Sequence, residues 1–386
     1  MIPYSEIEVY IEKLVKEEFN FKRNISLSNQ EGEFYNKNLI YYYLKILKVI
    51  AVSIKDFFYL KFLLLFFPSF FTNKHIVYTA KNFCSVDEKG NLEDRILKPI
   101  MKDNIIFINY GKEYLIKKIN GESVFNIGGI VKVKSFFIRR KFSNRMRIFK
   151  AYQNINNKIL KNLNNNFVYT LCFYDLNGFS LSFSMYRNKI TLVEVQHGSV
   201  INYPPYREPS PIKIADIFYV KNEATKLYIK NNLSKNFPAN YKLIPYPKSN
   251  LAYKEGIHIL YASTVEFNGF HPVFIKFLES NKLNNITVRV RLHPRERNNE
   301  PVFKSVLEQH NIEFEFDESK NWIESNTIKN LIVISPWSSV IEDSFDNDYQ
   351  TIIIDEVGKK RFNHLIDNKK CYFSKDIVET LELITN

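Results

Sequence analysis

The chain has 386 residues, of which 45% are hydrophobic and 25% charged, and its formal net charge is +13. This length and apolar content are sufficient for two domains with buried cores, while only 11 glycines and 14 prolines argue against long low-complexity regions. The basic excess favours anionic partners, such as nucleotides, acidic glycans, acidic lipids or nucleic acid.

The cysteines and the N-terminus indicate the compartment. Cys84, Cys172 and Cys371 lie far apart and form no CxxC pair. Neither a zinc knuckle nor a disulfide framework is therefore expected. The acidic start, Met1-Ile2-Pro3-Tyr4-Ser5-Glu6, lacks the layout of a signal peptide. We expect a cytoplasmic protein.

The first 72 residues are predicted to form a helical segment. Apolar spacing predicts helices over residues 5–20 and 38–67. Residues 39–71 are rich in Leu, Phe, Tyr and Ile, but charged residues interrupt them at Lys45, Lys48, Lys55, Asp56 and Lys61. The longest uncharged run, 62–71, is far shorter than the roughly 20 residues that span a bilayer. The segment is therefore either an amphipathic helix on the membrane surface or a helix packed on the first domain.

Residues 73–247 read as a first α/β domain. Short runs rich in β-branched and aromatic residues predict strands over 75–79, 105–108, 167–173, 190–195, 217–220 and 241–244. Helical patterns lie between several of these strands, at 145–163 and 222–233. Continuous apolar strands that alternate with helices indicate a parallel sheet covered on both faces.

Residues 248–386 read as a second α/β domain. The preceding stretch, Pro245-Tyr246-Pro247-Lys248-Ser249-Asn250, has the composition of a linker. Strands are expected over 257–262, 286–291, 312–316, 331–334 and 351–354, and helices near 271–281, 300–310, 339–346 and 375–384. The predicted fold class is therefore α/β, with two Rossmann-like domains in tandem after a helical N-terminal segment.

Basic residues concentrate between positions 132 and 150, where the sequence has no acid. They are Lys132, Lys134, Arg139, Arg140, Lys141, Arg145, Arg147 and Lys150. This cluster is either a solvated basic face or a contact for an anionic membrane or an anionic acceptor.

A histidine and a proline follow the strand expected at 286–291. The carboxyl end of that strand delivers His293, and Pro294 ends the strand ladder. An imidazole at this edge of a sheet can donate a hydrogen bond to a phosphate oxygen. Arg289 and Arg291 share one strand face, so part of the nearby positive charge points elsewhere. The alternative is an ordinary strand-end histidine in a basic loop.

A pair of serines follows the strand expected at 331–334. Ser338 and Ser339 come directly before a predicted helix, where free N–H groups and hydroxyls can hold an anion. The carboxylate of Glu342 could accept hydrogen bonds from the two hydroxyls of a ribose. The alternative reading gives the serines and Glu342 to a helix cap.

Two strand ends of the first domain carry polar residues. Asp175 follows the strand at 167–173 and is a candidate general base, or else a turn or cap aspartate. His197 ends the run Glu194-Val195-Gln196-His197-Gly198, and it offers a neutral donor to a sugar or to a leaving phosphate. The alternative is a strand-end histidine without a ligand.

Other nucleotide chemistries are disfavoured. The chain has neither GxxxxGK[ST] nor GxGxxG, which argues against kinases, ATPases and ordinary dehydrogenases. Asp346-Asn347-Asp348 has the Asp-x-Asp spacing of metal-dependent sugar transferases, but it falls between a predicted helix and a strand. We interpret it as a loop and expect no metal site.

The motifs resemble those of bacterial glycosyltransferases of GT-B fold that use CMP-activated acidic sugars. These are the bacterial sialyltransferases and the related capsule and lipopolysaccharide transferases of Kdo or other nonulosonates. The resemblance implies that the first domain, 73–247, binds the acceptor and the second, 248–386, binds the nucleotide-sugar donor. It also implies that His293-Pro294 and Ser338-Ser339 hold the CMP phosphate, with Ser263 and Glu342 among the donor-binding residues. It implies an acidic base in the first domain, for which Asp175 is the candidate, although Asp175-Leu176-Asn177-Gly178 departs from the Asp-Asp/Glu-Gly pattern of those families. Gln196-His197-Gly198 resembles a motif of capsule-polysaccharide transferases.

The resemblance implies an inverting, metal-independent transfer without a cofactor. The donor would be a CMP-linked sialic acid, Kdo or other nonulosonate, and the acceptor an oligosaccharide or glycolipid of capsule or lipopolysaccharide. Peripheral contact with the anionic inner face of the cell membrane would fit such an acceptor. The alternatives are a UDP- or GDP-sugar transferase, a CDP-polyol phosphotransferase, and a non-catalytic protein that binds membrane or glycan. Nucleic acid is not an expected partner, because no recognised motif accompanies the charge.

Overall fold

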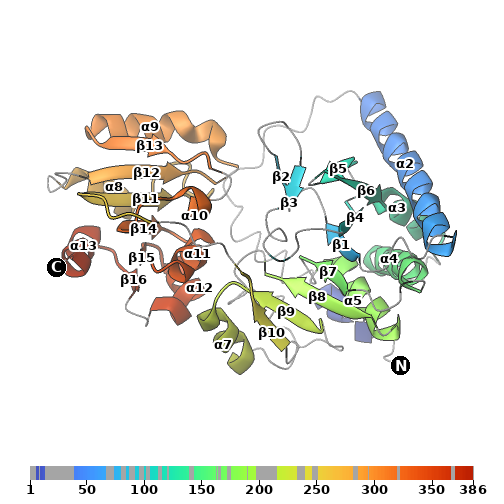
Figure 1. Ribbon diagram of the computed structural model, residues 1–386. Coiled ribbons are helices and arrows are strands. Elements are labelled where there is room, and N and C mark those ends of the chain that lie inside the picture. The colour runs from blue at the N-terminus through green and yellow to red at the C-terminus, as the bar shows by residue number, and fades with distance from the viewer. Residues whose placement is uncertain are drawn as a thin grey trace. The chain divides into compact units, whose positions relative to one another are not determined.

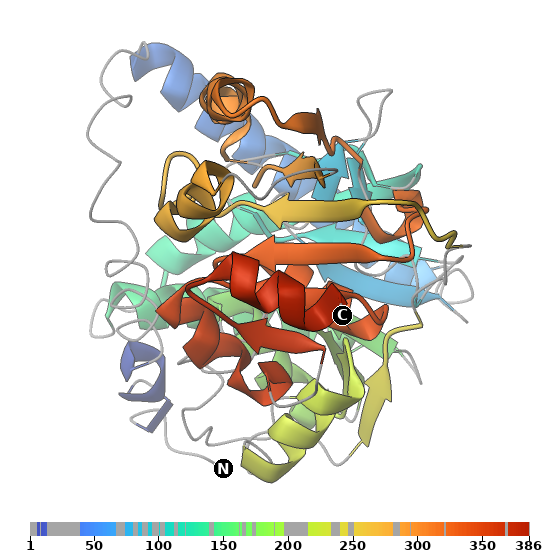
Figure 2. The same ribbon diagram turned by 90° about the vertical axis from the view of Figure 1, so that its left-hand side faces the viewer.

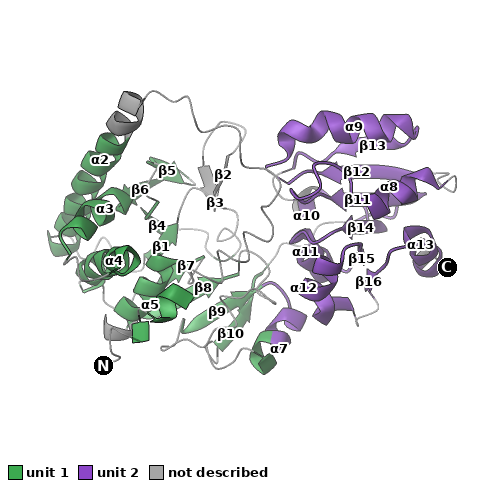
Figure 3. Ribbon diagram, turned by 180° about the vertical axis from the view of Figure 1, so that it is seen from behind, with its two compact units in different colours: residues 1–197, 204–220, 229–245 green, residues 198–203, 221–228, 246–386 purple. Residues whose placement is uncertain are grey.

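The structure is a computed structural model that divides into two compact units. It describes residues 6–7, 9–13, 39–66, 74–79, 84–86, 92–94, 100, 105–111, 115–119, 121–138, 143–161, 163, 167–171, 175–188, 190–196, 215–232, 240–245, 251–280, 286–293, 295–319, 322–366 and 370–385. Unit 1 comprises 1–197, 204–220 and 229–245, and unit 2 comprises 198–203, 221–228 and 246–386 (Figure 3).

Unit 1 is built on a mostly parallel sheet. Its parallel strands run in the order β6-β4-β1-β7-β8-β9-β10. They are β1 (His75–Thr79), β4 (Ile105–Asn109), β6 (Glu122–Asn126), β7 (Phe167–Thr170), β8 (Thr191–Val195), β9 (Ile217–Val220) and β10 (Asn240–Leu243). Chain order reverses between β1 and β7, which makes this sheet doubly wound.

Three short strands extend the β6 edge of this sheet. They are β5 (Lys118–Ile119), β3 (Leu92–Asp94) and β2 (Cys84–Val86), and the β5–β6 and β3–β2 pairs are antiparallel. The sequence analysis did not predict them or β6, because two- or three-residue strands and the mixed polar run of β6 give no clear period.

The helices of unit 1 pack as successive neighbours (Figure 1). Helix α2 lies beside α3, α3 beside α4, and α4 beside α5. They are α2 (Leu39–Phe66), α3 (Gly128–Phe136), α4 (Asn144–Leu160) and α5 (Leu176–Asn188). Residues 6–7 and 9–13 are also helical, and Ile7, Tyr10 and Ile11 are buried against α4 and α5. Within the described ranges, no helix combines the length and the apolar character that crossing a membrane requires.

Helix α5 corrects the sequence analysis, which assigned no helix there. Its serines alternate with apolar residues, a pattern that favours a strand. In the structure Ser180, Ser182 and Ser184 are all buried, and the Ser182 hydroxyl donates to the carbonyl of Gly178 one turn earlier at 3.2 Å. A serine whose hydroxyl donates to a carbonyl of its own helix can be buried on any side of that helix. The apolar period of 3.6 residues that would identify the helix is then lost.

Unit 2 is a wholly parallel sheet in the order β13-β12-β11-β14-β15-β16. The strands are β11 (Ile257–Ala262), β12 (Ile286–Arg291), β13 (Glu313–Phe316), β14 (Leu331–Ser335), β15 (Gln350–Ile353) and β16 (Cys371–Phe373). By position along the chain this order is 3-2-1-4-5-6, as in dinucleotide-binding folds, and the switch point lies between β11 and β14. The three-residue strand β16 was not predicted.

Helices cover both faces of the unit 2 sheet. One face packs on α8 (Pro272–Glu279), α9 (Glu300–Gln309) and α13 (Ile377–Thr385). The other packs on α10 (Trp322–Ser325), α11 (Val340–Asp346) and α12 (Glu356–Ile366). Figure 2 turns α13 and the C-terminus toward the viewer. A short 3-10 turn, η3 (Arg297–Asn299), precedes α9, and α7 (Glu223–Asn232) has residues in both units.

The predicted fold class is confirmed. The chain contains two Rossmann-like units in tandem, and the helical N-terminal segment is present as α2 within unit 1. The predicted strands of both series recur with shifts of one or a few residues. Residues 172–173 of the strand predicted at 167–173 lie outside the described residues.

Candidate functional site

Three predicted site residues meet at the carboxyl edge of the unit 2 sheet. The Ser263 hydroxyl, directly after β11, accepts the backbone N–H of His293, directly after β12, at 2.8 Å. The Ser335 hydroxyl at the end of β14 donates to the carbonyl of Ala262 at 2.8 Å and accepts the N–H of Ser338 at 3.1 Å. A continuous hydrogen-bonded path therefore joins the His293 and Ser338 segments across the switch point.

His293 is held as a neutral ring with a defined tautomer. Its Nδ1 accepts the backbone N–H of Arg295 at 3.2 Å. Burial, followed by the positive charge of Arg295, lowers the pKa of His293 below its ordinary value of 6.5. A neutral imidazole whose Nδ1 accepts must carry its proton on Nε2. His293 therefore presents an N–H donor that does not depend on protonation at neutral pH.

Glu296 supports this loop from within. Its carboxylate accepts the Ser263 hydroxyl, and its N–H donates to the carbonyl of His293 at 2.8 Å. The side chain is 1% exposed. Burial raises the pKa of Glu296 from 4.5 to about 7, and the nearby carboxyl of Glu266 adds to the rise. Glu296 is thus partly protonated at neutral pH, so it brings less than a full negative charge to this loop.

The serine pair begins the short helix α11. Ser339 is the N-cap residue, its side chain is exposed and it makes no capping hydrogen bond. The Ser338 hydroxyl instead accepts the N–H of Val340 at 3.3 Å. Helix α11 has seven residues, so its dipole contributes little. The Ser339 hydroxyl therefore has no capping role, and as an exposed group it could contact a ligand.

Glu342 is fully buried on α11, beside a mixed charge cluster. Lys221, which is 7% exposed, contacts Asp343 at 2.7 Å. Burial, followed by Asp343 and Glu342, raises the pKa of Asp346 to about 8. The side chain of Glu342 faces this cluster and not solvent. Its role as a ribose ligand stays a prediction.

The arginines of β12 point away from the switch point, as the shared strand face predicts. Arg289 pairs with Glu315, and Arg291 contacts Asp317 at 2.8 Å, both on the side of β13. Arg295, which is exposed, is close enough to His293 for its charge to act on the imidazole.

An aromatic and charged wall next to this edge was missed by the sequence analysis. The rings of Phe267 and Trp337 lie 5.6 Å apart, and the guanidinium of Arg361 lies 5.6 Å from the Trp337 ring. Burial raises the pKa of Glu266, while Arg361 opposes the rise. Nothing in the sequence around Phe267 or Arg361 indicated that these residues lie near His293. For Glu296 the sequence did hold an indication, because it is a lone acid within the basic run 289–297.

Asp175 caps helix α5 in unit 1. Its Oδ1 accepts the N–H of Gly178 at 2.6 Å, and its carbonyl accepts the N–H of Phe179 at 3.0 Å. Burial, followed by the charge of Asp175, raises the pKa of Tyr152. Asp175 is therefore confirmed as a helix-capping residue. Its role as a general base stays a prediction, in which the same carboxylate would also accept the acceptor's proton.

The remaining candidates are residues of the run 194–197 in unit 1 and Pro294 in unit 2. Gln196 is fully buried, and its N–H donates to the carbonyl of Tyr219 at 2.9 Å. His197 and Pro294 lie outside the described residues, so their predicted roles are untested. Glu194, the acid that begins this run, is fully buried in β8.

The Asp-x-Asp run forms a helix end and turn, as predicted. Asp346 is the last residue of α11, and Asp348 has a positive φ of 62° and pairs with Lys370. Across the described segments, no group of three or more His, Cys, Asp or Glu side chains is arranged to hold a metal ion.

Comparison with protein-family models and with curated proteins finds no match. Solved structures show distant similarity. The UDP-GlcNAc 2-epimerase from Neisseria meningitidis bound to UDP-GlcNAc has a TM-score of 0.47 and 12% identity, over 81% of this chain and 90% of that one. The lipopolysaccharide outer core galactosyltransferase WaaB has a TM-score of 0.45 and 10% identity, over 79% and 93%. Anabaena Alr3699/HepE in complex with UDP and glucose has a TM-score of 0.45 and 8% identity, over 81% and 89%. Similarity at this level assigns no activity, so the function must be argued from the residues of this chain.

Proposed function

We propose that the protein is a metal-independent, inverting glycosyltransferase of GT-B type whose unit 2 binds a nucleotide-activated sugar. The observation that carries this proposal is the neutral His293, whose N–H is held by Ser263 and whose Nδ1 accepts the N–H of Arg295, so that Nε2 carries the proton. His293 follows β12, and Ser263 follows the neighbouring β11 at the switch point of a doubly wound sheet. Open α/β sheets bind nucleotides at this point.

The chemistry requires stabilisation of a departing nucleotide phosphate. In an inverting transfer the acceptor hydroxyl attacks the anomeric carbon while the bond to the phosphate oxygen breaks. The Nε2–H of His293 and the exposed hydroxyl of Ser339 are the donors proposed to stabilise the negative charge that develops on that phosphate. The base proposed to take the acceptor proton is Asp175.

We propose a CMP-linked acidic sugar as the donor, because the order of the His-Pro and Ser-Ser motifs supports it. A UDP- or GDP-sugar and a CDP-polyol phosphate are the alternatives of the same fold. A capsule or lipopolysaccharide glycan, at the inner face of the cell membrane, is the proposed acceptor.

Ligand-induced stabilisation tests the donor assignment. The melting temperature is measured with CMP, CDP, UDP and GDP at equal concentration. CMP is expected to give the largest rise, since any ligand that binds only the folded state stabilises it by mass action. A larger rise with UDP or GDP replaces the CMP assignment, and no rise with any nucleotide favours a non-catalytic glycan- or membrane-binding protein.

A histidine pair supplies the matched control. His293→Gln removes the Nε2–H donor and is expected to abolish most of the rise and most of the sugar transfer. His258→Gln changes a histidine at the opposite, amino end of β11, where the ring contacts the carbonyl of Glu255 at 2.9 Å. The His258 variant should retain both properties. Equal effects of the two substitutions would contradict the proposed phosphate site.

A further inference from the structure

Helix α2 buries one of its faces in unit 1. Val49, Ser53, Phe57, Leu60 and Leu64 are all at most 5% exposed. The contact with α3 is close: the Ser53 hydroxyl accepts the N–H of Gly129 at 3.1 Å, and a Cβ on Gly129 would meet that hydroxyl at 2.7 Å. This face accounts for the attachment of α2 to the unit.

The opposite face of α2 is also apolar, yet it is exposed. Phe58 is 61% exposed, Phe62 47% and Leu65 57%. At 100° per residue, these three side chains and Leu47 fall within about 60° of arc on the helix surface. A soluble helix normally turns polar residues outward. The outward stripe of α2 is therefore a second apolar surface, and its side chains stay largely exposed among the described residues.

Charge on this side of α2 is positive. Lys48 and Lys55 are exposed at the edge of the stripe. Asp56 is the single acid of α2, and its carboxylate accepts two hydrogen bonds inside the unit, from the backbone and the side-chain N–H of Asn126 at 3.0 and 2.9 Å. The exposed stripe thus has lysines at its edge and no acid.

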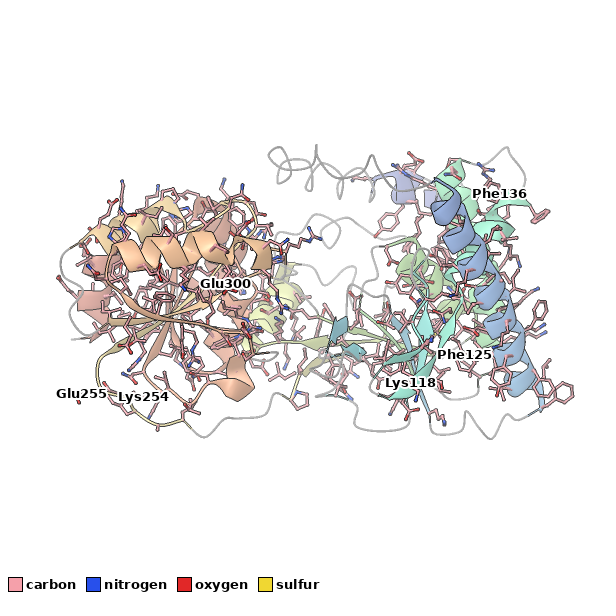
Figure 4. All side chains as sticks on the ribbon, turned by 90° about the horizontal axis from the view of Figure 1, so that it is seen from above. Lys118, Phe125, Phe136, Lys254, Glu255 and Glu300 are labelled. Carbon is pink, nitrogen blue, oxygen red and sulfur yellow. The ribbon has the colours of Figure 1, made fainter. Side chains whose placement is uncertain are left out.

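The end of α3 continues the same character. Phe136 is 72% exposed and Phe137 is 85% exposed. Figure 4 labels Phe136 on the side of unit 1 toward which α2 also projects side chains. Lys132 and Lys134 precede these rings, and the sequence continues into Arg139-Arg140-Lys141. We call this surface, formed by the outward stripe of α2 together with Phe136 and Phe137, the α2–α3 face.

We propose that the α2–α3 face binds the surface of an anionic lipid bilayer, with α2 lying in the plane of the interface. The phenylalanines and leucines would enter the boundary between headgroups and acyl chains, and the lysines would meet lipid phosphates. A second copy of this chain is a poorer occupant. A two-fold interface places the same face against itself, so the lysines would oppose one another.

Vesicle flotation of the full chain tests the proposal. We expect binding to vesicles of phosphatidylcholine with about 30% phosphatidylglycerol, and much weaker binding to pure phosphatidylcholine. The double variant Phe58→Ser/Phe62→Ser should lower partitioning by about tenfold or more. Lys48→Gln/Lys55→Gln should lower it on the order of tenfold at low salt and less in 0.5 M NaCl, where exposed charges are screened.

Matched controls come from unit 2. Tyr253→Ser/Leu383→Ser removes side chains that are 77% and 71% exposed, and Lys276→Gln removes an exposed lysine. These variants should bind anionic vesicles like the wild type. Equal losses in the controls, or no binding of the wild type, would overturn the proposal. So would a concentration-dependent dimer that Phe58→Ser/Phe62→Ser abolishes, since it would assign the face to a second copy.

The proposal is independent of the donor chemistry. The α2–α3 variants should keep the nucleotide-induced rise in melting temperature, which reports only on unit 2. Loss of vesicle binding with that rise intact therefore tests the membrane surface alone, and failure of the nucleotide assay leaves the flotation result interpretable.

Discussion

The side chain of Ser263 accepts the backbone N–H of His293 at 2.8 Å and donates its own proton to Glu296. One hydroxyl thereby links the ends of β11 and β12 to a buried acid three residues beyond the histidine. Glu296 in turn donates its N–H to the carbonyl of His293. The position of His293 is fixed by backbone bonds on both sides, which leaves the ring to serve a ligand.

Ser263→Ala should weaken both the fold and the nucleotide site. The substitution leaves a partly buried N–H and a buried carboxyl without their shared partner, which costs about 1–3 kcal/mol. We expect a lower free energy of urea unfolding and about tenfold weaker binding of the best nucleotide by calorimetry. The control is Ser280→Ala, which removes a hydroxyl at the end of α8 that donates to Phe277, and it should change neither value appreciably. Normal nucleotide affinity in Ser263→Ala would show that the link does not position the site.

The stability difference between the wild type and Glu296→Gln should depend on pH. Because the folded-state pKa of Glu296 is raised from 4.5 to about 7, the folded protein binds this proton more tightly than the unfolded chain. The contribution of Glu296 to stability is fully present below pH 4.5, decreases as pH rises toward 7, and is level above pH 7. The variant has no such loss, so it should gain stability relative to the wild type between pH 5 and pH 8. Urea unfolding at pH 5 and pH 8 measures the free energy of unfolding of both proteins. If the difference between the two proteins is the same at both pH values, the carboxyl titrates normally.

Asp175→Asn and Asp175→Ala should separate catalysis from capping. Asparagine keeps an oxygen that can accept the N–H of Gly178, so its fold should be nearly as stable as the wild type. Alanine loses the cap and should cost about 1 kcal/mol of unfolding free energy. Both variants should lower turnover strongly while the donor KM changes little, since neither can accept a proton from an acceptor hydroxyl. Wild-type turnover in Asp175→Asn would restrict this residue to its cap and move the base elsewhere.

Gly358→Ala should destabilise unit 2 and disturb the serine loop. A Cβ at Gly358, in α12, would lie 1.9 Å from the carbonyl oxygen of Pro336, two residues before Ser338. Backbone must shift to admit it, which typically costs about 1–3 kcal/mol. The control is Gly269→Ala, whose Cβ would meet only Val302 at 3.6 Å. Thermal unfolding compares the two, and equal stability would show that the Pro336 loop yields without strain.

The candidate residues of unit 2 could be predicted from the sequence better than those of unit 1. His293 follows a strand in which apolar and polar residues alternate, and Ser338 follows a strand that is apolar up to its last residue. Parallel strands place their carboxyl ends at one edge, so the proximity of the two residues could be predicted without coordinates. Asp175 could be placed at a strand end, but its capping of Gly178 could not be distinguished from a catalytic role. The α5 helix was missed because buried serines satisfied by their own helix imitate the period of a strand.

Local chemistry in the sequence was enough to determine two Rossmann-like units and the strand ends that carry polar residues. Hydrophobic periodicity, apolar runs and turn residues involve only a few neighbouring positions, so they can be recognised directly in the sequence. Only the tertiary structure decided that Ser263 and Glu296 support His293, that Phe267, Trp337 and Arg361 form an adjacent wall, and that α2 turns one apolar face inward and another outward. Each of these features depends on contacts between residues distant in sequence, or on which side of a helix meets the core. Patterns over a few neighbouring residues reveal neither.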